Sequence, residues 1–207
     1  MTITEAPKYE FTDETREGAG VSLRRIRALR DLPAIGVSAG DLGGWLESEH
    51  NLDQAGACWV GAEAAVFGRA RVTGHAVVSG RARIFGSACV SGRARVHEAL
   101  VFDRARVRGV ASVLGDAQVF DYALVQGTAE VRDGARVGDH ATVEGSAVVS
   151  GQAQVLLSST LGGHLRVGGR TVVVGKSRAE VERRTRARER ARHIAALTEH
   201  LSAAGTC

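Results

Sequence analysis

Histidines are the residues of this chain best suited to acid–base or metal chemistry. Four of them, His75, His97, His140 and His164, lie between residues 58 and 175, and His97 is followed directly by Glu98. A positioned histidine can act as a general base, and several histidines together can hold a metal ion. His97 and Glu98 are the candidate catalytic residues, and their role depends on the elements that position them.

The element that carries these histidines is a six-residue repeat running from Cys58 to Gly175. An aliphatic residue, usually valine, returns every six residues with a small residue, usually alanine, two places before it. Twenty such positions run from Val60 to Val173, with one five-residue step between Val96 and Val101. A short fixed period predicts a solenoid. Alternation along an extended backbone sends the small and aliphatic residues inward, and the glycine-rich pair that follows turns the corner.

A longer period gives the number of hexads in each turn. The residue after the core aliphatic is phenylalanine at Phe67, Phe85, Phe102 and Phe120, which are 18, 17 and 18 residues apart, and the gap of 17 spans the short step. Three hexads per turn are therefore predicted, forming a triangular rod about 30 Å long. The four rings should stand in a row on one outer face.

This register allows the histidines to be weighed as functional residues. His97 lies at the short step, where the corner must be distorted, but its outward position holds Ser79 one turn before and Leu114 one turn after. An ordinary surface position therefore accounts for His97 better than catalysis does. His75 and His164 share a column but lie five turns, about 24 Å, apart. No metal site within one subunit is predicted.

The repeat resembles the left-handed β-helix of the hexapeptide-repeat, or LpxA-like, superfamily, with a right-handed β-helix as the structural alternative. The superfamily motif is an aliphatic residue followed four places later by a small one, as in Val60 and Ala64. The stretches Gly43-Gly44-Trp45 and Cys58-Trp59-Val60 are similar to the opening of YdcK-type proteins of bacteria and phages, which carry a transferase label. The resemblance implies a trimer and, in its enzymes, coenzyme A-dependent acyl transfer with a histidine base between subunits.

Three regions are expected. Residues 1–57 comprise a flexible segment to about residue 20, a strand or short helix near 21–30, of which we favour the strand, and a cap for the open end of the coil. Trp45, Leu52 and Trp59 supply this cap, and the glycines of 39–45 lack the features of a phosphate loop. Residues 58–175 form the β-helix. Residues 176–207 are a basic helix and tail, in which an apolar stripe is thin and no aromatic platform accompanies the arginines, so nucleic-acid binding is not expected.

Composition bears on location and redox state. No apolar N-terminal run resembles a secretory signal and no stretch reaches membrane-spanning length, so a cytoplasmic protein with no membrane contact is expected. The three cysteines are dispersed without a CxxC spacing: Cys58 in an inward slot, Cys89 on an outward one and Cys207 at the end. Free thiols are predicted.

The phenylalanine row is the strongest functional signal in the sequence. Four outward rings, with Leu100 and Leu156 on the same face, form a larger apolar stripe than a monomer usually exposes. Another subunit, the N-terminal segment or the C-terminal helix should cover this stripe. We favour another subunit, in a homotrimer assembled through this face and used as a non-catalytic binding or scaffold module without a cofactor. The other function class left open is an acyltransferase that uses acetyl-coenzyme A.

Overall fold

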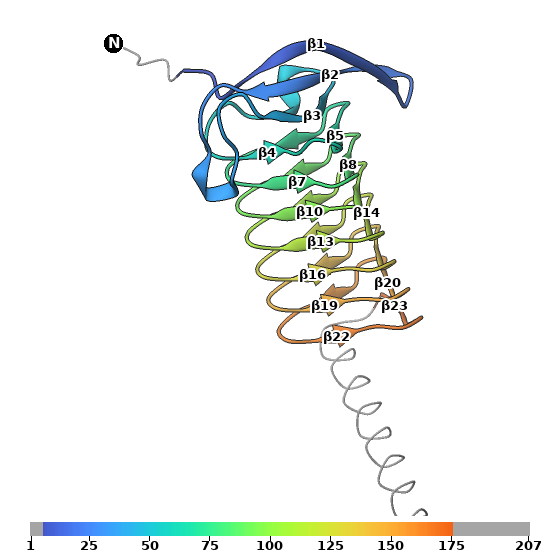
Figure 1. The fold of residues 1–207 in the computed structure, drawn as a ribbon. Coiled ribbons are helices and arrows are strands. Elements are labelled where there is room, and N and C mark those ends of the chain that lie inside the picture. Colours follow the sequence, from blue (N-terminus) through green and yellow to red (C-terminus); the bar gives the residue numbers. More distant parts are fainter. Residues whose placement is uncertain (1–5, 176–207) are drawn as a thin grey trace, which may run out of the picture.

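The fold is a parallel β-solenoid of about seven turns with an antiparallel cap at its N-terminal end (Figure 1). It is seen in a computed structural model that describes residues 6–175. Three sheets form the sides of the coil, and most coil strands are only two or three residues long. Strands that neighbour one another in a sheet, such as β8, β11 and β14, are three apart in chain order, so three strands make one turn.

Each of the three sheets draws its coil strands from every turn in succession. The ten-stranded sheet holds, in order, β1 (Tyr9–Gly18), β2 (Val21–Ala28), β3 (Leu42–Leu46), β5 (Ala65–Val66), β8 (Arg83–Ile84), β11 (Leu100–Val101), β14 (Gln118–Val119), β17 (Arg136–Val137), β20 (Gln154–Leu156) and β23 (Val172–Val174). The seven-stranded sheet holds β22 (Arg166–Val167), β19 (Val148–Val149), β16 (Glu130–Val131), β13 (Ser112–Leu114), β10 (Arg95–His97), β7 (Val77–Ser79) and β4 (Trp59–Val60). The six-stranded sheet holds β21 (Thr160–Leu161), β18 (Thr142–Val143), β15 (Leu124–Val125), β12 (Arg106–Val107), β9 (Cys89–Val90) and β6 (Arg71–Val72).

The core is a column of small and aliphatic side chains stacked in register. Val101 pairs with Ile84 on one side and Val119 on the other, and the alanines two places earlier are equally inaccessible to solvent. Backbone amides donate to carbonyls of the next turn, as from Arg83 N to Ala99 O at 3.0 Å. The alternation predicted from the sequence is confirmed, because the repeating aliphatic residues point inward and their neighbours outward.

The five-residue step is accommodated at one corner by a single residue. Between β10 and β11 the backbone turns through Glu98, whose φ is 57°. The neighbouring turns place Gly80 and Gly115 in the same left-handed conformation at this corner, and each of those glycines is followed by a second corner residue. Non-glycine residues seldom adopt this conformation. The deletion is thereby absorbed without moving the strands on either side out of register.

The cap is built by adding antiparallel strands to the ten-stranded sheet. β1 and β2 form a hairpin whose two-residue loop, Ala19 and Gly20, has positive φ at both positions, which suits the twist of a tight hairpin. β2 pairs antiparallel with β3, and β3 pairs parallel with β5 of the coil. Two short 3₁₀ helices, η1 (Pro33–Ile35) and η2 (Glu49–Asn51), complete the connections.

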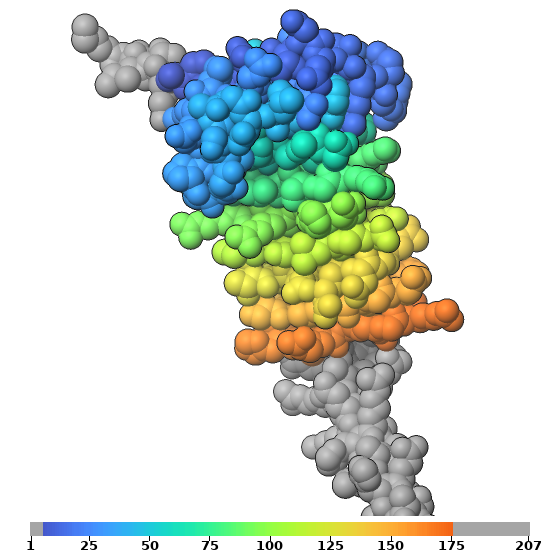
Figure 2. Space-filling view, viewed as in Figure 1, coloured from blue at the N-terminus to red at the C-terminus, as the bar shows by residue number. Residues whose placement is uncertain are grey.

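From Tyr9 onward the N-terminal segment is a strand and not the flexible segment that was expected. The strand β1 begins at Tyr9, because Tyr9 and Phe11 pair with Ala28 and Ile26 of β2 and Tyr9 is buried. The strand expected near residues 21–30 is present as β2. Figure 2 shows the cap, in blue, covering the first turns of the coil, with later turns following in bands along the rod.

Two sequence expectations concern residues that the structure does not describe. The basic helix predicted within 176–207 and the position of Cys207 both lie outside residues 6–175. Within the described part, no helix is long and apolar enough to cross a membrane.

Candidate binding surface on the ten-stranded sheet

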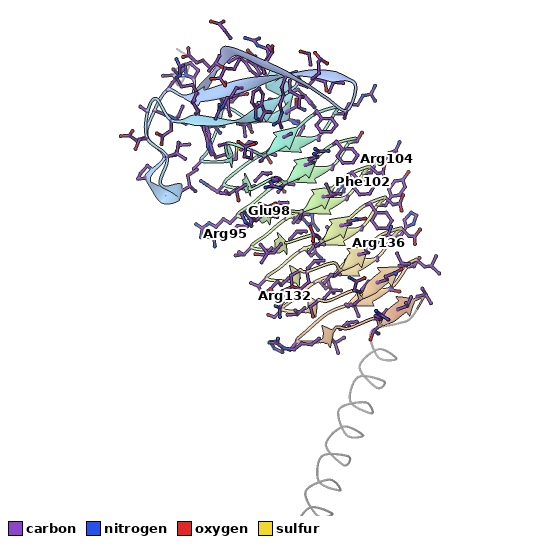
Figure 3. The ribbon with its side chains drawn as sticks, turned by 45° about the vertical axis from the view of Figure 1, so that its right-hand side comes forward. Arg95, Glu98, Phe102, Arg104, Arg132 and Arg136 are labelled. Atoms are coloured by element: carbon purple, nitrogen blue, oxygen red, sulfur yellow. The ribbon has the colours of Figure 1, made fainter. Side chains whose placement is uncertain are left out.

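The four phenylalanines predicted to stand in a row form a continuous ring stack. Phe67, Phe85, Phe102 and Phe120 follow β5, β8, β11 and β14, so each ring lies one turn from the next. Their centroids are 5.2, 5.0 and 5.5 Å apart, and their planes differ by 4°, 4° and 12°. Each ring covers a face of its neighbour, which leaves all four half-buried with their edges turned outward. Figure 3 shows Phe102 within this row.

The stack ends at Phe120 because the next position in the column is Gly138. A β-carbon placed on Gly138 would lie 2.3 Å from Cζ of Phe120, so the ring occupies the space that a side chain would need. Arg136 covers the same ring from the adjacent position, with its guanidinium carbon 5.2 Å from the centroid, a distance typical of a cation–π contact. The stack therefore ends at Phe120, because Gly138 has no side chain to continue the column and the Arg136 guanidinium lies over the last ring.

The two leucines predicted on this face also lie outward and half-buried. Leu100 lies in β11, between Arg83 and Gln118 of the neighbouring turns. Leu156 ends β20 and occupies the phenylalanine column two turns beyond Phe120. The face thus carries a stack of rings and one leucine beside it, with the second leucine beyond Gly138.

The corner that follows the stack carries polar columns. Asp103, Asp121 and Asp139 each adopt a positive φ, and the carboxylate of Asp139 accepts a hydrogen bond from Leu157 N one turn later at 2.9 Å. Aspartate tolerates this backbone conformation better than most residues. The carboxylates are engaged with the backbone, so the role of this column is to shape the corner.

Beside the aspartates, three side chains stack on the exposed edge of the same corner. Arg104 donates to the phenol oxygen of Tyr122 at 2.8 Å, and its guanidinium lies 5.3 Å from that ring. Tyr122 in turn stacks on His140, with centroids 4.9 Å apart. Tyr122 is 51 % exposed. Arg104 and Tyr122 were not singled out from the sequence, and with His140 they extend the ring-rich surface around the corner.

The candidate catalytic residues lie at the other end of β11 from the phenylalanines. His97 is exposed, pairs in register with Ser79 and Leu114 as predicted, and its Nδ1 lies 3.0 Å from Ser79 Oγ. Glu98 is exposed and turns the corner; Figure 3 labels it across the coil from Phe102. The side-chain partner of the His97 ring is therefore the Ser79 hydroxyl, and within residues 6–175 no carboxylate hydrogen-bonds to the ring.

The three residues predicted to cap the coil have different surroundings. Leu52 is inaccessible to solvent and forms a parallel β-bridge with Val72 of β6, which is a strand of the six-stranded sheet. Trp59 is 4 % exposed, and its ring lies against Gly43 of β3. Trp45 points outward from β3 and is half-buried, with Arg16 and Arg25 over its ring at 4.4 and 5.6 Å. Its neighbour Leu46 is the β3 residue that enters the core.

A buried lysine is part of the cap and was not found by sequence reasoning. Lys8 is inaccessible to solvent, and its Nζ donates to Asp53 O at 2.6 Å and to Cys58 Sγ at 3.1 Å. Burial raises the pKa of the Cys58 thiol, and the charge of Lys8 acts in the opposite direction. This contact joins the N-terminal segment to the first turn of the coil, across 50 residues of sequence.

The described side chains do not form a cluster suited to a metal ion. Residues 6–175 contain no group of three or more histidine, cysteine, aspartate or glutamate side chains placed to hold one metal ion. The exposed histidines of the coil are distributed along its length, at His75, His97, His140 and His164. The ring-bearing face of the ten-stranded sheet is the surface on which a functional role can be argued.

The geometry defines a class of protein, the parallel β-solenoids built from hexapeptide repeats. Three short parallel strands per turn, with valine and alanine inside, are the features of this class. Within it, residues 135–151 match the family model described as the YdcK Beta solenoid repeat. The match and the fold bear out the resemblance seen in the sequence. No curated protein matches the chain.

Proposed function

We propose that this chain is a rigid, non-catalytic binding or scaffold module, a left-handed β-helix that assembles as a homotrimer through the face bearing the phenylalanine stack. The observation that carries the proposal is the stack itself. Four parallel rings, with Leu100 beside them, occupy one side of a sheet and none is fully buried by residues 6–175.

The chemistry of this face favours burial against another apolar surface. A buried aromatic side chain removes roughly 150–250 Å² from water, and stacking has already removed part of that area within the chain. The outward edges remain, and they form a row rather than isolated contacts. Contiguous apolar area of this kind marks interaction sites on soluble proteins. A second copy of the chain presents the same row and is therefore a suitable partner.

The rigidity of the coil supports a scaffold role. Phe85 and Phe102 are each held between two other rings, and the coil strands are hydrogen-bonded from turn to turn. Side chains that are already ordered lose little conformational entropy on association, which improves affinity for a given area. A preorganised flat face suits repeated docking better than it suits a reaction that needs a closed site.

The acyltransferase class receives less support from the described residues. The His97 ring contacts the Ser79 hydroxyl and is exposed, whereas a general base is usually oriented by a further group. Glu98 serves as the corner residue of the shortened hexad. The scaffold proposal accounts for both residues without assigning them chemistry.

Light scattering coupled to gel filtration tests the assembly. The wild-type protein is expected at about three times the 21.8 kDa mass of the chain. Phe102→Asp should shift the protein to lower mass, because it places a charge in the contact. The matched control is Leu124→Asp, an outward half-buried leucine on the six-stranded sheet, which should leave the mass unchanged. A monomeric wild type, or equal loss of assembly in both variants, would contradict the proposal.

A further inference from the structure

A small pocket lies where the hairpin of the cap meets the first turns of the ten-stranded sheet. Its volume is about 190 Å³. The hairpin contributes Arg16, Glu17 and Leu23, and the coil contributes Ala65, Phe67 and Arg83. The pocket therefore combines an apolar wall, one aromatic ring and two guanidinium groups. Every lining residue belongs to one chain, so the pocket is complete without a second copy, although Phe67 also belongs to the face proposed to assemble the trimer.

The pocket is lined by two guanidinium groups and one carboxylate, Glu17, so its lining carries a net positive charge. Among residues 6–175, no carboxylate forms an ion pair with Arg16 or Arg83, and Glu17, which also lines the pocket, is paired with neither. Arg25, whose charge also acts on Arg16, is paired with Glu14 at 2.8 Å. Two arginine side chains facing one pocket favour an anion with two oxygens, because a guanidinium binds a carboxylate through paired hydrogen bonds.

The electrostatics of Arg16 agree with this geometry. Burial lowers the pKa of the Arg16 guanidinium, Glu63 opposes that shift, and the like charges of Arg83 and Arg25 add to it. Arg16 is also held in place by its contact with Trp45. An anion bound between Arg16 and Arg83 would relieve the repulsion between two cations that are otherwise kept close together.

The aromatic wall of the pocket is the first ring of the phenylalanine stack. Phe85 covers one face of Phe67, and no other ring of residues 6–175 stacks against it. The equivalent position one turn nearer the cap is Glu47, which follows Leu46 of the strand paired with β5. Its carboxylate accepts a hydrogen bond from Gly68 N at 2.6 Å and is thereby engaged at the corner. A flat group entering the pocket would extend the stack.

We infer that this pocket binds a small aromatic carboxylate, with its ring against Phe67 and Leu23 and its carboxylate between Arg16 and Arg83. A volume of 190 Å³ is below the roughly 300–1,000 Å³ typical of drug-sized ligands, which limits the ligand to about one ring. Offset stacking at about 4.5–7 Å is the preferred arrangement of aromatic pairs. The charged arginines select the acid over its neutral amide.

Benzoate is the probe for this site, and its binding to the full chain is measured by ligand-observed nuclear magnetic resonance and by calorimetric titration. We expect saturable binding of benzoate, and at least tenfold weaker binding of benzamide, which has the ring without the charge, and of acetate, which has the charge without the ring. Losing one charge-assisted hydrogen-bonding group costs about tenfold or more in affinity.

Arg83→Gln is the deciding variant, because Arg83 is an exposed side chain whose removal leaves the core intact. It should weaken benzoate at least tenfold. Arg71→Gln, an equally exposed arginine on the six-stranded sheet, should bind as wild type does. The inference is overturned if benzoate does not saturate, if benzamide binds as well as benzoate, or if both arginine variants behave alike. Because Phe67 also belongs to the proposed interface, the titration is repeated on Phe102→Asp; absence of benzoate binding to both proteins overturns the inference whatever mass light scattering finds.

Discussion

The contact between Gly138 and Phe120 gives a sharp test of the ring stack. Replacing Gly138 by alanine adds one methyl group, and its β-carbon would lie 2.3 Å from the Phe120 ring. Carbon atoms that are not bonded to each other do not approach this closely in proteins, so the Phe120 ring has to move away from its place against Phe102. The backbone of Gly138 has no positive φ. The effect of the substitution is therefore steric and not conformational.

The change in the free energy of unfolding combines two destabilising contributions and one stabilising contribution. Loss of a stacked aromatic pair costs about 0.5–1.5 kcal/mol, and insertion of a methyl group into a filled space costs about 1–3 kcal/mol. Against this, replacing glycine by alanine stabilises by about 0.4–1 kcal/mol through the unfolded state. The net expectation is a loss of about 0.5–4 kcal/mol in the free energy of unfolding, measured by urea denaturation followed by circular dichroism.

A double-mutant cycle and a control isolate the cause. In a Phe120→Ala background the ring is gone, so Gly138→Ala should be neutral or stabilising there. Gly134→Ala is the matched control, because its β-carbon would meet the flexible end of Gln152 at 3.3 Å and Gly151 O at 3.5 Å, an ordinary contact distance. It should be neutral or stabilising by up to about 1 kcal/mol. An equal cost for Gly138→Ala with and without the Phe120 ring would refute the account of how the stack ends.

Three further expectations concern the cap and the coil. Burial raises the pKa of the Tyr9 phenol above its ordinary 10.0, so the folded state favours the protonated form. The contribution of this group to the free energy of unfolding should be fully present below about pH 10 and should be lost as pH rises beyond it. Tyr9→Phe should reduce that loss, measured by urea titrations at several pH values. With Cys207 replaced by serine, a maleimide should modify the half-exposed Cys89 in the native protein and the buried Cys58 only after unfolding; rapid native labelling of both thiols would show that the cap opens. Acetyl-coenzyme A should give no thermal shift, and His97→Ala should leave stability unchanged within about 0.5 kcal/mol; saturable coenzyme binding would favour the acyltransferase class instead.

The coil could be predicted from sequence because its restraints repeat. An inward aliphatic residue recurs six residues after the previous one throughout the coil, so one irregularity, such as the five-residue step at Glu98, does not obscure the pattern. The 18-residue spacing of the phenylalanines likewise anticipated their alignment, since register in a parallel coil is uniform. Parallel stacking of the rings at 5.0–5.5 Å follows from that alignment and the spacing between turns.

The cap could not be predicted in the same way, because nothing in it repeats. The hairpin has a local signal in Ala19-Gly20, but the apolar residues of β1 are too few to reveal a strand. Burial of Lys8 depends on a contact with Cys58 that no periodicity encodes. The pocket beside Phe67 combines residues of the hairpin with residues of two coil turns, so it exists only once the cap has been placed on the sheet.

The uniform separation between hydrogen-bonded turns has a consequence for how this protein can change in evolution. Insertion or deletion of 18 residues adds or removes one whole turn, and every later residue keeps its sheet and its column. A six-residue change instead carries all later residues to a neighbouring side of the rod, which would divide a functional stripe between two faces. The single-residue corner at Glu98 shows that a one-residue loss is tolerated where a left-handed residue can replace a corner pair. Lengthening by whole turns is thus the change that preserves both the ring stack and the cap pocket.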